Sequence, residues 1–132
     1  MANVKILDNF AEIISQFQGT PGNQINLEQL NNTEEKLRDI LSQLQFELLN
    51  AQQKRNWEEV NKLELALTEC QLTINRVTAA IINVSIIGIN QNNLAEMQKI
   101  LQEIDTARKT QVNIDFAIRL LGFLRGLFLR SL

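Results

Sequence analysis

The side chains that could do chemistry in this chain are carboxylates and one thiol. The 132 residues include 15 Asp and Glu residues and a single cysteine, Cys70, but no histidine and no tyrosine. Most of the carboxylates fall in predicted first helical turns or on polar helix faces, where capping and solvation account for them. A di-metal site in a helical bundle usually needs Glu-x-x-His pairs, which this chain cannot supply. We therefore expect no metal site.

Cys70 occupies an apolar position within a long helical repeat. A reactive thiol needs a neighbouring base or a cationic environment, and the sequence offers neither at this position. Gly19 and Gly22 flank Pro21 at a predicted helix end, which is a termination signal and not a phosphate-binding loop. The sequence thus predicts a non-enzymatic protein with no catalytic residues and no cofactor.

Length, charge and composition narrow the class further. A chain of 132 residues with 45% hydrophobic residues suits one domain spanning 1–132. The formal net charge of −2, without a run of like charges, gives no reason to bind nucleic acid. A single cysteine and the lack of a signal-peptide pattern favour a reduced, cytoplasmic setting. Arg119 and Arg125 interrupt the C-terminal apolar run, so we expect no membrane-spanning helix.

Apolar residues at three- and four-residue spacing predict four helices, over residues 3–18, 27–53, 57–89 and 94–130. Helix starts are marked by an Asn followed three residues later by Gln or Glu, at Asn26, Asn56 and Asn93. The third helix is apolar on two sides, which predicts a central position between several neighbours. The expected fold is an all-α, antiparallel up-down four-helix bundle with unequal helix lengths.

Two alternatives concern the third helix. The β-branched run from Ile81 to Ile87 is also typical of a strand, but the seven-residue repeat continues through it and favours helix. At the start of this helix, the turn followed by Trp57-Glu58-Glu59 resembles helix hairpins of all-α adaptors and chaperones, including tetratricopeptide units. A tetratricopeptide array would need a second copy about 34 residues further on, and the sequence contains none.

The C-terminal segment carries more apolar surface than one neighbouring helix would bury. Because the first helix is short, part of the third and fourth helices lacks a fourth neighbour. Burial of such a face would contribute roughly 10 kcal/mol before ordering costs. We therefore predict a partner or oligomer interface there. Its predicted residues are Leu65, Leu72, Val112, Phe116, Leu120, Phe123, Leu127 and Phe128.

Three occupants could cover this interface. A second copy, giving a homodimer, is favoured; the others are another protein's helix and the chain's own C-terminal turns, bent back at Gly122 or Gly126. The function expected is thus a protein-protein interaction or oligomerisation module. One alternative is a peripheral membrane protein, because three arginines, Arg119, Arg125 and Arg130, accompany phenylalanines in this segment. Another is a small helix-binding chaperone or adaptor.

Overall fold

The computed structural model describes residues 4–20, 22, 24–84, 86–110 and 113–129. Within them the chain forms five helices and two short strands. In chain order these are α1 (Val4–Gln18), β1 (Gln24–Ile25), α2 (Leu27–Gln53), α3 (Trp57–Ile82), β2 (Ile87–Gly88), α4 (Gln91–Arg108) and α5 (Ile114–Phe128). The all-α class is confirmed. The prediction of four helices is wrong, because the described part of the chain has five.

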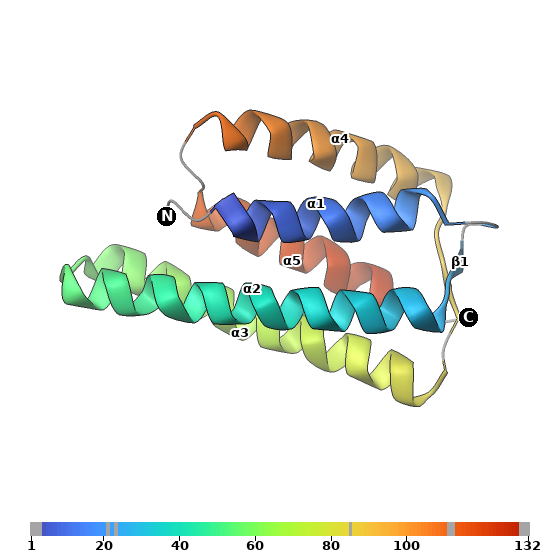
Figure 1. Ribbon diagram of the computed structural model, residues 1–132, viewed down its shortest axis with the longest axis horizontal. Helices are drawn as coiled ribbons and strands as arrows, with labels where there is room; N and C mark the ends of the chain where they lie inside the picture. Colours follow the sequence, from blue (N-terminus) through green and yellow to red (C-terminus); the bar gives the residue numbers. More distant parts are fainter. Residues whose placement is uncertain (1–3, 21, 23, 85, 111–112, 130–132) are drawn as a thin grey trace.

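Consecutive helices run in opposite directions (Figure 1). α3 packs against α2 and α5, and α1 packs against α2, α4 and α5. α1, α2, α3 and α5 therefore enclose the main core, while α4 covers α1 on the side away from α3 (Figure 1). β1 and β2 pair antiparallel at one end of the bundle, with Gln24 opposite Gly88 and Ile25 opposite Ile87.

The boundaries of α2 match the prediction because its capping signal is satisfied. The Asn26 side chain accepts a hydrogen bond from the Gln29 backbone N–H at 2.8 Å, and the Gln29 side chain accepts one from the Asn26 backbone N–H at 3.0 Å. This reciprocal pair satisfies two donors that a helix start leaves free. The start of α3 is also confirmed, since the Asn56 side chain accepts from the Glu59 N–H.

The predicted extension of the third helix to residue 89 is wrong. α3 ends at Ile82, and Val84 has φ 47°, in the left-handed region. Such a backbone stops a right-handed helix and is strained for a β-branched residue. Ile87 then pairs with Ile25 in the two-stranded sheet. Of the β-branched run, Ile81 and Ile82 are helical and Ile87 lies in a strand, so neither the helix nor the strand alternative holds for the whole run.

The predicted fourth helix is two helices. α4 begins after the N-cap Asn90, three residues earlier than expected, and ends at Arg108. Asn113 then caps α5, since its side chain accepts from the Asp115 N–H at 2.8 Å, and α5 runs back alongside α3. The bend proposed at Gly122 or Gly126 is absent, because α5 is continuous through both glycines.

The apolar face of α5 fills the space that the sequence left without a partner. Leu121 and Leu124 are fully buried, and the rings of Phe17 and Phe128 meet edge to face with centroids 6.1 Å apart. The chain thus supplies its own fourth helix, by reversing between α4 and α5. The α2–α3 hairpin projects past the starts of α1 and α5 and the end of α4 (Figure 1).

Leu121→Ala tests whether α5 is part of the core. The substitution removes buried side-chain volume, so we expect the free energy of unfolding to fall by about 2–5 kcal/mol. Leu65→Ala on the half-exposed face of α3 is the matched control and should change stability by no more than about 0.5 kcal/mol. Chemical denaturation of both variants measures the difference. Equal effects would contradict the internal position of α5.

Val84→Gly tests the strain after α3. Glycine adopts positive φ freely, so we expect this variant to be more stable than Val84→Ala by about 1 kcal/mol. Val84→Ala keeps the penalty on φ and is the control for loss of the side chain. Thermal or urea unfolding distinguishes them. A glycine variant less stable than the alanine variant would contradict strain at this position.

Candidate interaction surface

The structure separates the residues predicted to form one interface. Leu120, Leu127 and Phe128 are buried in the chain's own core, and Phe116 and Phe123 are half-buried against it. Leu65 and Leu72 are exposed on α3. Val112 lies outside the described residues. The apolar side chains of α5 and those of α3 therefore do not form one open face in this fold.

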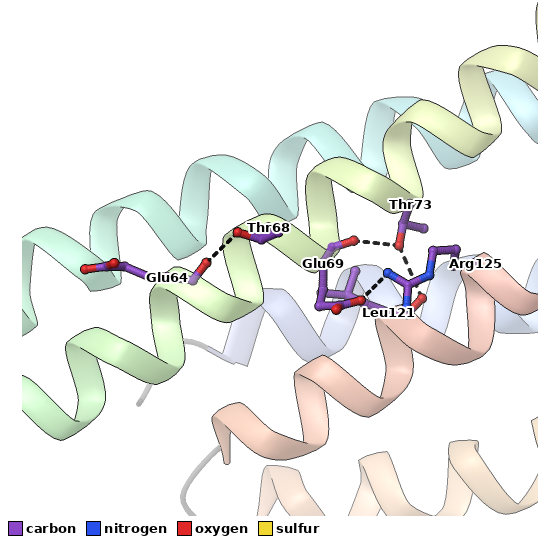
Figure 2. A network of polar contacts seen from close by, with 6 residues as sticks. All are labelled: Glu64, Thr68, Glu69, Thr73, Leu121 and Arg125. Atoms are coloured by element: carbon purple, nitrogen blue, oxygen red, sulfur yellow. Dashed lines mark hydrogen bonds and ion pairs between the residues drawn. The ribbon is translucent and has the colours of Figure 1, made fainter.

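A polar network holds α5 against α3 between these two groups (Figure 2). Arg125 of α5 donates to the Glu69 carboxylate of α3, and both side chains are partly buried. The Thr73 hydroxyl lies 2.8 Å from the carbonyl oxygen of Glu69 and 3.3 Å from that of Leu121, so its proton is shared between two acceptors. Paired polar groups thus close the interface between α3 and α5.

Leu65 and Leu72 flank this network on α3. They lie four residues before and three residues after Glu69, which places all three side chains on neighbouring positions of the helix surface. Each is about half exposed, at 50% and 44%. They remain available for contact, but as two leucines beside an ion pair and not as the edge of a large apolar face.

A groove of about 800 Å³ runs between α4 and α5. Lys99, Glu103, Phe116 and Arg119 contribute to its lining. Arg119 pairs with Glu103, and its guanidinium lies 5.0 Å from the centroid of the Phe116 ring. These contacts neutralise charge inside the groove and occupy the aromatic face, so its residues chiefly join α4 to α5.

The projecting end of the α2–α3 hairpin carries large apolar side chains that the sequence analysis did not assign to an interface. Phe46, Leu49 and Trp57 are 60%, 58% and 59% exposed. We call these three residues the tip patch. Phe46 lies two residues after the buried Leu44, a spacing that cannot place both on one helix face. This position, away from the buried face of α2, was the signal in the sequence that could have marked Phe46 as exposed.

The turn beneath the tip patch is well ordered by hydrogen bonds. Arg55 takes a left-handed conformation with φ 56°, and the Asn56 N–H donates to the Ala51 carbonyl at 3.0 Å. The Asn56 side chain caps α3 and also donates to the Glu59 carboxylate at 3.0 Å. Trp57 therefore projects from a fixed helix start, which lowers the entropy lost when a partner covers it.

Cys70 lies where its chemistry is suppressed. The thiol is buried between α2 and α3, with Sγ 3.5 Å from the Leu37 carbonyl oxygen. Burial raises the pKa of Cys70 from 9.0 to about 12, because a thiolate there would lose its hydration. The thiol consequently stays protonated at neutral pH and acts as a small apolar core residue.

The raised pKa of Cys70 predicts a pH effect on stability. Above pH 9 the unfolded chain ionises this thiol while the folded chain keeps it protonated until about pH 12, so stability is lost as pH rises through this window. Between pH 8 and pH 10 we expect wild type to lose about 1 kcal/mol more than Cys70→Ala, which has no thiol to ionise. Urea unfolding at both pH values measures this difference. Parallel losses in the two proteins would contradict a buried, protonated thiol.

Comparison with known proteins gives no indication of function, so function is argued from the surface of the molecule. No family model, curated protein or solved structure matches this chain. Among the described residues, no helix is long and apolar enough to cross a membrane, and no three potential metal-binding side chains gather at one place. The features that bear on function are the tip patch, the leucines of α3 and the opposite end of the bundle.

Proposed function

We propose that this chain is a non-enzymatic protein-protein interaction module that docks another protein's apolar surface on the tip patch. The observation that carries the proposal is the exposure of two aromatic rings and a leucine on the end of a projecting, hydrogen-bonded hairpin. Tryptophan is among the residues that most often dominate binding energy at interfaces. Full burial of each side chain would contribute about 1.5–3 kcal/mol.

The composition around the tip patch suits a specific interface. Lys54, Arg55 and Glu58 lie between or beside the apolar residues along the chain, and all three are exposed. Interfaces commonly combine a small apolar centre with a polar rim that stays hydrated. Charges of both signs on this rim can fix the orientation of a partner and reject wrong ones.

This proposal moves the docking surface away from the C-terminal helix. The apolar residues of α5 are largely used inside the chain, and its arginines are engaged: Arg119 with Glu103 and Arg125 with Glu69. The same contacts lower the support for a peripheral membrane helix, because such a helix must present its arginines to headgroups and its apolar face to lipid. A helix-binding adaptor remains compatible with the tip patch.

Site-specific photo-crosslinking tests the proposal. Trp57 is replaced by the aromatic crosslinker p-benzoylphenylalanine, and a control chain carries it at exposed Gln102 on α4. Irradiation of cells producing each protein should give a discrete adduct with another protein from position 57 and not from position 102. Phe46→Ser in the position-57 chain should weaken that adduct several-fold, because it removes one of the apolar side chains that hold the partner.

The purified protein offers a second measurement, since Trp57 is the sole tryptophan. Its emission should be that of a solvated indole in the free protein and should shift to shorter wavelength with the identified partner. Identical adducts from positions 57 and 102, or an adduct containing only a second copy of this chain, would refute docking of another protein at the tip patch.

A further inference from the structure

The end of the bundle opposite the hairpin tip exposes a second group of large aliphatic side chains. Ile82, Val84 and Ile86, which lie between α3 and β2, are 73%, 67% and 51% exposed. Leu27 at the start of α2 and Leu129 at the end of α5 are also exposed. Half of the ten exposed large hydrophobic residues of the described chain thus belong to this group.

Strand pairing and helix packing bring these residues to one end. Ile25 pairs with Ile87, so Leu27 and Ile86, which lie within two residues of that pair, come to the same edge. Contact between Phe17 and Phe128 places the end of α5, with Leu129, beside the end of α1. Figure 1 shows the start of α2, the end of α3 and both strands gathered at this end. We call it the basal end.

The basal end is almost free of charge. Residues 18–20, 22, 24–27, 77–84 and 86–95, which carry the two strands and the adjoining helix ends, contain no Asp, Glu, Lys or Arg, although 21% of the whole chain is charged. Their exposed polar residues are largely amides, including Gln24, Asn83, Gln91 and Asn92. Depletion of charge around an apolar centre is typical of the buried part of an interface.

These properties select a second copy of this chain as the occupant, and we propose that two molecules associate end to end through the basal end. A two-fold interface brings a surface against itself, so a charge near the axis would meet its own copy, and a neutral surface avoids that repulsion. Amide groups carry both donors and acceptors, so each can pair with its own counterpart. A membrane surface would instead favour basic and aromatic residues, which these residue ranges lack.

Backbone strain at Val84 also supports association through the basal end. A β-branched residue at φ 47° costs stability that glycine or asparagine would avoid, and here its side chain is two-thirds exposed in the monomer. Residues held in such conformations cluster at functional sites, such as active sites, ligand clamps and switch regions. The strained turn aims an aliphatic group outward between Ile82 and Ile86, the position a contact with a second copy would use.

End-to-end association would place the two tip patches at opposite ends of the dimer. Each tip would then be free to engage its own partner, and two linked sites raise the avidity for a partner that presents two docking surfaces. Self-association through the basal end does not depend on what the tip patch binds.

Sedimentation equilibrium over a dilution series tests the proposal on the full chain. Wild type should show a monomer-dimer equilibrium, with a dimer Kd that changes little between low and high NaCl because charge pairs do not hold it. Ile86→Asp and Ile82→Asp each place two like charges in a neutral interface and should raise the Kd at least tenfold, which corresponds to about 1.4 kcal/mol. Small-angle scattering should show a dimer close to twice the monomer's length.

Leu72→Asp is the matched control, because it places the same charge on an exposed leucine of α3 away from the basal end. It should leave the Kd unchanged. Far-UV circular dichroism checks that every variant keeps its helix content. A strictly monomeric wild type, an unchanged Kd in both basal variants, or an equal rise in Leu72→Asp would each overturn the proposal. Failure to dimerise would leave the tip-patch crosslinks unaffected, so the two proposals fail separately.

Discussion

Burial of the leucine face of α5 against α3 and α1 is the interaction on which the rest of the structure depends. α2 and α5 both pack against the buried face of α3, while Leu65 and Leu72 on its other apolar line stay exposed. The contact with α5 leaves Leu121 and Leu124 at zero exposure. The polar groups that this contact buries are paired between α3 and α5: Thr73 with the Leu121 carbonyl, and Glu69 with Arg125. Because an unpaired buried polar group is costly, apolar burial and polar pairing act together there.

This internal closure decides where the molecule remains open. Had α5 continued from α4 in one long helix, its apolar face would have required another molecule. Once α5 folds back, most large exposed apolar side chains lie at the two ends of the bundle. One group lies on the projecting α2–α3 hairpin, and the other lies at the basal end, where the strands are. The two extremities differ in chemistry, since the tip patch lies among charges of both signs and the basal end has almost none. Different surfaces of this kind suit different partners.

Much of the fold could be predicted because local signals and the final structure agree. α1 and α2 follow from their periodicity and from the Asn26 capping box. The break between Arg108 and Ile114 could not be predicted, because that stretch contains neither glycine nor proline and the apolar spacing crosses it without a change of phase. The end of α3 was misplaced for a related reason: periodicity extends to Gly88, but Ile87 gains more by pairing with Ile25, a contact between residues 62 positions apart.

By itself, the sequence determined the helical class, the first two helices, the apolar inventory and an inert core position for Cys70, because each depends on side-chain chemistry and short-range spacing. Only the tertiary structure decided which apolar residues stay in water. Leu127 and Phe46 are both large and apolar, yet the first is 2% exposed and the second 60%. That difference depends on which helices become neighbours, and hence on a chain reversal whose free energy comes from long-range packing. The interaction surfaces of this protein are therefore a property of its fold, and hydropathy alone could not locate them.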